Sequence, residues 1–190
     1  MLHMEQKGYK DYKLEIVNEL LSNANHIRGI AKKLGTNHMN IVRKIKELAK
    51  ENAVDFKEEG RNKVYFLKHT IEAKNYVFSA ENYKLNKLLK KYPILRSVIE
   101  KIQNDKRIKL AVLFGSYAKG IAKLESDIDI YIDTANKTIK GELSLINSKL
   151  SIKIGDYNKS NLLIREIEKN HVILKGVEEY YEKNKFFEQT

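Results

Sequence analysis

Two aspartates, Asp127 and Asp129, lie one residue apart in an apolar run of the C-terminal half. Alternate residues of a strand point to the same face, so both carboxylates are expected on one side of a sheet. Upstream, the apolar run 110–114 ends in Gly115-Ser116. A Gly-Ser turn just before a helix start leaves backbone N–H groups free to meet an anion. A metal site beside a phosphate site is what transfer of a nucleotide group requires.

The spacing of these residues resembles the signature of the DNA polymerase β-type nucleotidyltransferases. The segment 115–120, GSYAKG, is most similar to the minimal nucleotidyltransferase branch of that family. The resemblance implies that Asp127 and Asp129 are catalytic and hold Mg²⁺ or Mn²⁺, for which oxygen ligands are suited. It also implies that Gly115, Ser116 and Lys119 bind the phosphates of a nucleoside triphosphate.

The family usually carries a third carboxylate on a later strand, and this chain has none at the expected place. The strand is expected at 150–154, where Ser151 or Lys153 takes the position, depending on the register. Asp133 has the strand parity of Asp129 but lies four residues away, roughly 13 Å at about 3.3 Å per residue, too far to join the metal. The sequence therefore leaves open whether the site transfers a nucleotide or only binds one.

The first 70 residues show the pattern of three helices followed by a hairpin. Helical spacing of apolar residues predicts helices at 9–21, 27–34 and 38–50, and β-like runs lie at 53–57 and 63–67. This order resembles the winged helix-turn-helix of many archaeal and bacterial regulators. In that family the second helix of the pair enters the major groove and the hairpin, or wing, contacts the DNA backbone.

The resemblance assigns DNA contacts to eight residues of the second helix and the wing. They are Asn37, His38, Asn40, Arg43, Lys44, Arg61, Asn62 and Lys63. Glu58 and Glu59 also lie in the wing and would repel phosphate. The alternatives are that these side chains form an ordinary solvated surface, or that the unit binds a protein.

The fold class expected from these patterns is α+β, with three parts. The predicted parts are a winged helix-turn-helix at 9–70, a connecting helix at 71–92, and a small mixed-sheet nucleotidyltransferase domain at 93–190. The second boundary is placed at Pro93, the only proline of the chain, which can start a helix at its first position.

The composition favours a soluble protein that binds a polyanion. The net charge of +11 favours double-stranded DNA or another nucleic acid as a partner. No apolar run approaches the roughly 20 residues of a membrane span, and the first residues lack a signal-peptide pattern. The absence of cysteine excludes a disulfide framework and thiolate metal sites and fits a cytoplasmic location.

The leading functional hypothesis is a DNA-binding nucleotidyltransferase, similar to archaeal predicted nucleotidyltransferases. It would transfer an NMP group, with AMP expected first, from a nucleoside triphosphate such as ATP to a hydroxyl acceptor of unknown identity. One alternative is a transcriptional regulator whose catalytically silent transferase fold senses nucleotide. Another is an antitoxin, because many minimal nucleotidyltransferases pair with a toxin. The resemblances also imply that the acceptor of the nucleotide could be a protein and that the chain could form a homodimer.

Overall fold

The structure is a computed structural model that describes residues 10–188, and it divides into two compact units. The boundary between them falls inside helix α4 (Ile71–Lys91), between Ala80 and Glu81. The three parts predicted from the sequence met at 70/71 and 92/93, at the two ends of this helix. Tyr9, Gln189 and Thr190, which the predicted parts included, lie outside the described residues.

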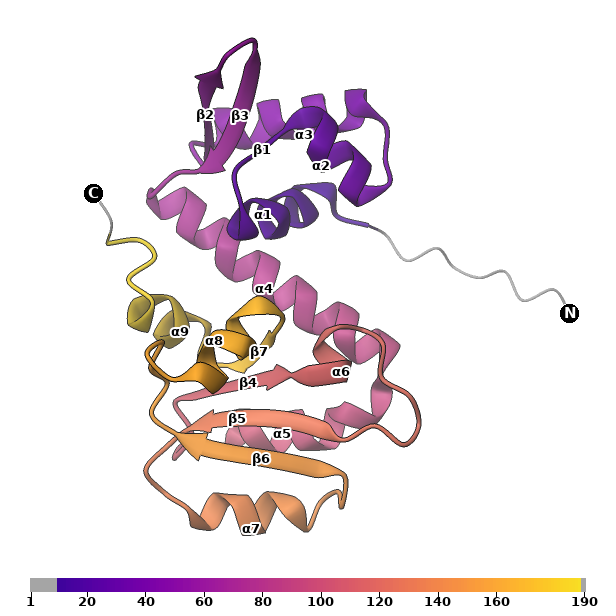
Figure 1. The fold of residues 1–190 in the computed structure, drawn as a ribbon, viewed down its shortest axis with the longest axis vertical. Coiled ribbons are helices and arrows are strands. Elements are labelled where there is room, and N and C mark those ends of the chain that lie inside the picture. Colours follow the sequence, from indigo (N-terminus) through magenta and orange to yellow (C-terminus); the bar gives the residue numbers. More distant parts are fainter. Residues whose placement is uncertain (1–9, 189–190) are drawn as a thin grey trace, which may run out of the picture. The chain divides into compact units, whose positions relative to one another are not determined.

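The N-terminal unit combines helices with a small sheet, as Figure 1 shows. Its elements are α1 (Tyr12–Ser22), β1 (Asn25–His26), α2 (Ile27–Leu34), α3 (His38–Lys50), β2 (Val54–Glu59) and β3 (Asn62–Leu67). The strands are antiparallel in the order β1-β3-β2. This is the winged-helix arrangement predicted from the sequence. The two-residue strand β1 was not predicted.

The turn between α2 and α3 follows from two local signals. Gly35 ends α2 at φ +60°, and the N–H groups of Gly35 and Thr36 bond back to the carbonyls of Lys32 and Ala31. This is a Schellman motif, in which a left-handed glycine satisfies the free carbonyls of a helix end. Asn37 then caps α3, since its side-chain oxygen accepts from the N–H of Asn40 at 2.7 Å.

The C-terminal unit is a four-stranded mixed sheet with helices on it. Its strands β4 (Leu110–Phe114), β5 (Ile128–Asp133), β6 (Leu150–Gly155) and β7 (Val172–Lys175) lie in the order β6-β5-β4-β7. Only β5 and β6 are parallel; β4 is antiparallel to both of its neighbours. The remaining elements are η1 (Pro93–Leu95), α5 (Arg96–Asn104), α6 (Gly115–Ala118), α7 (Thr138–Ser144), α8 (Leu162–Lys169) and α9 (Val177–Lys183).

Alternation along β5 separates the core of this unit from its polar face. Ile128, Ile130 and Ile132 are fully buried in an apolar cluster that includes residues of α5 and α7. The intervening residues, Asp129 and Asp133 among them, point to the other face. The α+β class predicted from the sequence is therefore confirmed, and Asp129 lies on the face of β5 opposite the core, whereas helix α7 was not expected.

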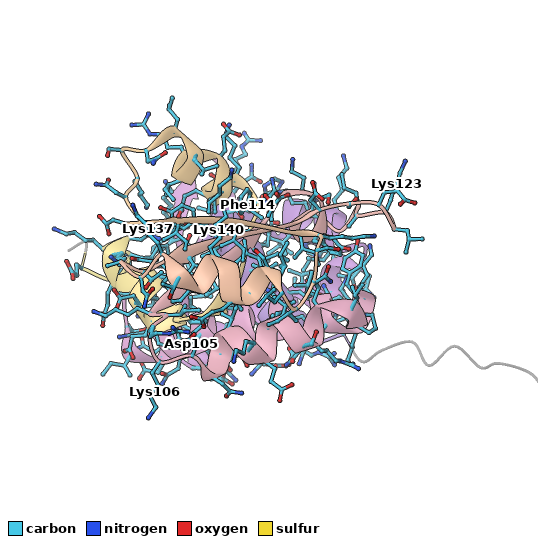
Figure 2. The ribbon with its side chains drawn as sticks, turned by 90° about the horizontal axis from the view of Figure 1, so that it is seen from below. Asp105, Lys106, Phe114, Lys123, Lys137 and Lys140 are labelled. Atoms are coloured by element: carbon cyan, nitrogen blue, oxygen red, sulfur yellow. The ribbon has the colours of Figure 1, made fainter. Side chains whose placement is uncertain are left out.

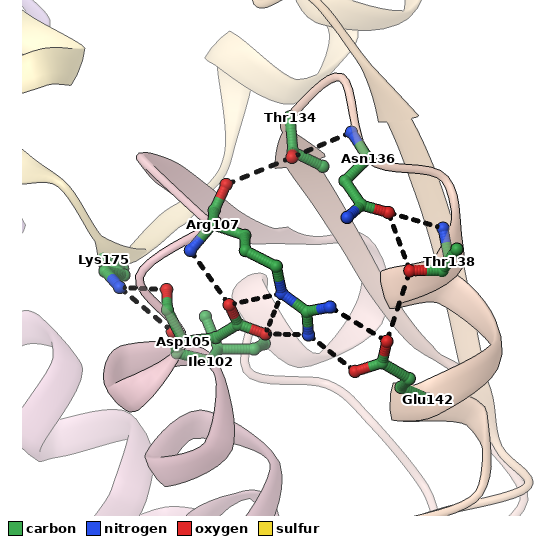
Figure 3. A network of polar contacts seen from close by, with 8 residues as sticks. All are labelled: Ile102, Asp105, Arg107, Thr134, Asn136, Thr138, Glu142 and Lys175. Carbon is green, nitrogen blue, oxygen red and sulfur yellow. Dashed lines mark hydrogen bonds and ion pairs between the residues drawn. The ribbon is translucent and has the colours of Figure 1, made fainter.

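A polar network ties α5, the strand ends and α7 together, as Figure 3 shows. The Arg107 guanidinium donates to both carboxylate oxygens of Asp105 and to both of Glu142. The Thr134 hydroxyl donates to the Arg107 carbonyl at 3.1 Å. The guanidinium holds the pKa of Asp105 at about 2. The carboxylate of Glu142 is thus paired with Arg107.

Gly176, between β7 and α9, is where a side chain is least tolerable. Its φ is +79°, and a Cβ there would lie 2.1 Å from the backbone oxygen of Lys109. Backbone atoms of Lys109 and Leu110, where β4 begins, cannot move aside as a flexible side-chain end can. We therefore expect Gly176→Ala to lower the free energy of unfolding by about 3 kcal/mol, by left-handed strain plus the clash.

The measurement for Gly176→Ala is urea unfolding of the whole chain. Gly60→Ala is the matched control, because Gly60 has φ +61° and nothing within 4 Å of a Cβ. Equal losses in the two variants would contradict the prediction.

Within residues 10–188, no helix is both long and apolar enough to cross a membrane.

Candidate functional site

The centre of the candidate site is the contact between Gly115 and Asp129. Phe114, the last residue of β4, pairs with Asp129 of β5 in the antiparallel register. The chain then turns at Gly115, where φ is +71°. A Cβ on Gly115 would lie 2.3 Å from a carboxylate oxygen of Asp129. The carboxylate thus occupies the space that any other residue would fill, so the glycine-serine turn and the second aspartate form one structure.

Helix α6 covers the first four residues of the segment 115–120 and is closed by a second Schellman motif. The N–H of Gly120 bonds to the carbonyl of Tyr117 at 3.0 Å, and that of Ile121 bonds to the carbonyl of Ser116 at 3.0 Å. Gly120 is left-handed, at φ +72°. The final glycine of the motif therefore ends the helix, while Gly115 makes room for the carboxylate.

The end of α4 holds α6 in place. The rings of Tyr92 and the buried Tyr117 make an edge-to-face contact, with centroids 4.9 Å apart. The Lys91 ammonium donates to the carbonyl of Gly120 at 2.6 Å. A role for Lys91 and Tyr92 in positioning α6 was not predicted from the sequence, from which 71–92 was expected to be a connecting helix. Lys119 is exposed at the C-terminal end of α6.

The two aspartates differ in their surroundings. Asp127 is exposed immediately before β5, whereas Asp129 is half-buried. Burial raises the pKa of the Asp129 carboxyl, and the charge of Asp127 raises it further. A hydrogen bond from Ser151 and the charge of Lys153 lower the pKa, but they do not cancel the effect of burial. The site thus has an exposed carboxylate immediately before β5 and a half-buried one within β5.

The register of β5 and β6 decides which residue stands where a third carboxylate is expected. Asp129 pairs with Ser151, and Tyr131 pairs with Lys153. Ser151 is therefore the direct neighbour of Asp129, and its hydroxyl is a hydrogen-bond partner of that carboxylate. Lys153 is the next residue of β6 on the same face.

Asp133 and Asp156 are paired with a lysine of α9. Asp133, at the far end of β5, pairs with Lys183 of α9 at 3.0 Å. The same ammonium lies 3.3 Å from Asp156. Within the described part of the chain, no cluster of three or more histidine, cysteine, aspartate or glutamate side chains could hold a metal ion.

The residues present suit one divalent ion shared with a phosphate. Mg²⁺ is commonly bound by one or two carboxylates together with substrate phosphates, and Asp127 and Asp129 supply that pair. Gly115 leaves the space in which the second carboxylate lies. A second ion would lack a carboxylate on β6, because Ser151 is neutral.

The loop from α6 to β5 borders the site and carries exposed side chains of mixed kind. Ile121 and Leu124 are 68% and 79% exposed. In Figure 2, Lys123 lies on this loop where it extends outward from the rest of the unit. The ammonium of Lys149, just before β6, bonds to the carbonyl of Leu124 and ties the loop to the neighbouring strand.

Helix α3 of the N-terminal unit presents a basic outer face. Ile41, Ile45 and Leu48 are buried in the unit. A surface pocket of about 330 Å³ lies along the outer side and is lined by Met39, Val42, Arg43, Lys46, Glu47 and Lys50. Helical spacing from Arg43 could have predicted Lys46 and Lys50, since residues three, four and seven apart share a face.

Several predicted DNA contacts of α3 already have partners within the unit. Lys44 pairs with Glu47 at 2.8 Å, which reduces the charge that it offers to phosphate. The Asn37 side chain caps the helix, and Asn40 bonds to Thr36 and accepts from Arg43. His38 is exposed at the start of the helix.

The wing is a tight hairpin whose turn is Gly60-Arg61, shorter than the five-residue connection expected from the sequence. Glu59 at the tip pairs with Lys57 at 2.7 Å, so part of its repulsion for phosphate is compensated. Lys63 lies over the ring of Phe56, with its ammonium 3.9 Å from the ring centroid. Arg61 and Asn62 are exposed.

Comparison with protein families assigns the C-terminal unit. Residues 96–179 match the family model described as "Polymerase beta, Nucleotidyltransferase". No protein of curated function matches the sequence significantly.

Solved structures resemble parts of the chain at low TM-scores. The adhesin competence repressor AdcR from Streptococcus pyogenes is 18% identical, with a TM-score of 0.40, over 49% of this chain and 70% of AdcR. A MarR family transcription regulator is 16% identical, with a TM-score of 0.36, over 50% of this chain and 67% of that one. A toxin-antitoxin structure with AMP-PNP is 26% identical, with a TM-score of 0.33, over 54% of this chain and 77% of that one.

TM-scores below 0.5 do not establish a common fold, so the assignment of the N-terminal unit depends on its own strand order and helix arrangement. The assignment of the C-terminal unit depends on the family match and on the contact between Gly115 and Asp129. Residues 96–179 are therefore a nucleotidyltransferase domain of the polymerase β type, joined to an N-terminal unit with winged-helix topology.

Proposed function

We propose that this protein binds double-stranded DNA through its N-terminal unit and transfers an NMP group, with AMP expected first, from a nucleoside triphosphate to a hydroxyl acceptor. We also propose the division of labour predicted from the sequence, with DNA contacts within 9–70, a connecting helix at 71–92 and the transferase at 93–190. The observation that carries the transferase proposal is the Asp129 carboxylate seated in the space of the missing Gly115 side chain.

In the proposed reaction, an acceptor hydroxyl oxygen forms a bond to the α-phosphorus of the triphosphate. The bond from that phosphorus to the bridging oxygen breaks, and pyrophosphate leaves with the bonding electrons. The hydroxyl proton passes to solvent or to a carboxylate of the site. A bound Mg²⁺ or Mn²⁺ would supply charge stabilisation at the phosphate oxygens.

The roles of the chain's own residues follow from their places. Asp127 and Asp129 hold the metal, with Asp129 oriented by Ser151. The first N–H groups of α6, at Gly115 and Ser116, are available to phosphate oxygens because the first residues of a helix have no intrahelical acceptor. Lys119 extends from the other end of α6 as a candidate phosphate partner.

The test is label transfer from each α-labelled nucleoside triphosphate, with Mg²⁺ or Mn²⁺ and cell extract as the source of acceptors. Wild-type protein is compared with the Asp127→Asn/Asp129→Asn double variant. Label that appears only with the wild type supports the transferase and identifies the base. Label in both samples, or in neither, contradicts it.

The second candidate function is a nucleotide-sensing regulator, and the neutral Ser151 beside Asp129 favours it. Without a third carboxylate, an acceptor hydroxyl has one base fewer near it, and binding can persist without transfer. This candidate predicts metal-dependent nucleotide binding that is lost in the double variant, no label transfer, and DNA affinity that changes when ATP is added.

We expect the charges on the outer face of α3 to dominate DNA affinity. Arg43→Ala and Lys46→Ala should each weaken duplex binding and reduce the salt dependence of log K by about one unit. Lys44→Ala is the matched control on the same helix, because its ammonium is already paired with Glu47. The measurement is fluorescence anisotropy of a labelled duplex between about 50 and 200 mM salt. An effect of Lys44→Ala equal to the other two would contradict this assignment.

A further inference from the structure

The place of the third carboxylate is filled by a neutral residue, and a cation follows it on the same face. In the parallel pairing of β5 and β6, Ser151 lies beside Asp129 and Lys153 lies beside Tyr131. Residues 151 and 153 share a face because side chains alternate along a strand. The strand that should offer a ligand to a second metal ion therefore offers a hydroxyl and an ammonium.

The Lys153 ammonium is within electrostatic reach of the site. Its charge acts on the Asp129 carboxylate. Two residues along a strand correspond to about 6.6 Å, a separation that the flexible four-carbon stem of lysine can span. The side chain is exposed, so its ammonium is free to change position.

A second divalent ion is disfavoured here for two reasons. Hard cations require oxygen ligands, preferably carboxylates, and β6 has no acidic residue beside Asp129. A divalent ion placed at Ser151 would also be repelled by the ammonium, and like charges a few ångströms apart cost free energy even in partly hydrated sites. The triphosphate, by contrast, is negatively charged and is attracted both to one divalent ion and to the Lys153 ammonium.

We propose that Lys153 supplies the second positive charge of the nucleotide site, so that a nucleoside triphosphate is bound with one divalent ion instead of two. This inference rests on the proposed nucleotide binding and adds to it the metal stoichiometry and a specific phosphate-binding residue. Ammonium groups bind phosphate as point charges, which requires proximity but no fixed geometry.

The test counts Mn²⁺ ions by electron paramagnetic resonance in the presence of a non-hydrolysable ATP analogue. The full chain is expected to hold one Mn²⁺ per bound nucleotide. Ser151→Asp restores a carboxylate beside Asp129. The double variant Ser151→Asp/Lys153→Met also removes the repulsion by the ammonium, and it is expected to hold two Mn²⁺ ions per bound nucleotide. Lys153→Met alone should weaken nucleotide affinity about tenfold or more and leave the count at one.

Lys140→Met is the matched control, because Lys140 is an exposed lysine of α7, the helix that packs on the opposite, apolar face of the sheet. It should leave both the affinity and the ion count unchanged. Circular dichroism confirms that each variant is folded before ions are counted.

The outcomes separate this inference from the proposed function. Two Mn²⁺ ions per nucleotide in the wild type, or equal affinities for Lys153→Met and Lys140→Met, would overturn the inference and leave nucleotide binding intact. No metal-dependent nucleotide binding in the wild type would overturn the proposed function itself.

Discussion

Gly115→Ala is expected to weaken metal-dependent nucleotide binding at least about tenfold. It should also lower the free energy of unfolding by more than the cost of holding an alanine in the left-handed conformation. The added Cβ would lie 2.3 Å from a carboxylate oxygen of Asp129, so the carboxylate or the turn must shift. Left-handed strain costs about 1–2 kcal/mol, and displacement of Asp129 adds to it. Affinity is measured by titration with a fluorescent ATP analogue and Mg²⁺, and stability by urea unfolding.

Gly120→Ala separates backbone strain from loss of the carboxylate. Gly120 is left-handed at φ +72° just after the same short helix, but a Cβ there meets only the flexible end of Lys91, at 3.4 Å. We expect Gly120→Ala to cost about 1–2 kcal/mol of stability and to retain nucleotide binding. If the two variants behaved alike in both measurements, the contact with Asp129 would not be the reason for glycine at 115.

A double-variant comparison isolates the contact further. In an Asp129→Ala background the carboxylate no longer occupies the space beside Gly115, so Gly115→Ala should cost only its backbone strain. The difference between the two backgrounds is the interaction free energy of the pair. An identical cost in both backgrounds would contradict the close approach of the two residues.

Asp129→Asn is expected to remove nucleotide transfer and to make the folded protein more stable at neutral pH. A metal site contributes several kcal/mol of charge stabilisation, so loss of about 3 kcal/mol corresponds to a rate at least about 100-fold lower. The gain in stability has a separate cause. Burial raises the pKa of Asp129 above its ordinary value, so the folded state resists its ionisation.

The sign of the pH dependence follows from proton binding. Between the ordinary carboxyl pKa of the unfolded chain, about 3.9, and the raised pKa of the folded one, the native state holds more protons. The Asp129 contribution to stability therefore falls as pH rises through this window. Asp129→Asn should be more stable than the wild type above the window and lose that advantage below about pH 4.

Thermal unfolding of Asp129→Asn and wild type from pH 3 to pH 8 tests this prediction. Asp127→Asn is the control, because the Asp127 side chain is exposed before β5 and remains in water. It should lose transfer as Asp129→Asn does, with a smaller gain in stability. A melting temperature of Asp129→Asn at or below that of the wild type at neutral pH would contradict the stated burial cost.

Much of the fold could be predicted because it follows from local patterns. Apolar spacing in α3 and alternation in β5 place their buried faces, and turn glycines such as Gly35 mark helix ends. The short β1 and the helix α7 were missed. Strand β1 has only two residues, too few to show a periodicity. Helix α7 has only two buried apolar residues, Ile139 and Leu143, which do not reveal a helix without the sheet against which they pack.

The candidate site divides in the same way between sequence and structure. The sequence by itself determined the residue types and spacing of the 115–129 motif, and therefore the kind of chemistry, because only α6 and a short loop separate Gly115 from β5. Only the tertiary structure decided the identity of the neighbour of Asp129 on β6. Strand pairing brings Ser151 beside it, and that register depends on the burial of Ile130 and Ile152 against the helices, not on any local signal.

The same distinction applies to charge. The sequence determined that the protein is basic, with a net charge of +11, since that is a property of composition. Which cations are free to meet phosphate was decided by side-chain pairing: Lys44 is bound to Glu47, whereas Lys46 lines the outer pocket of α3. Pairing depends on distances of a few ångströms between side chains, and only the folded chain sets those distances.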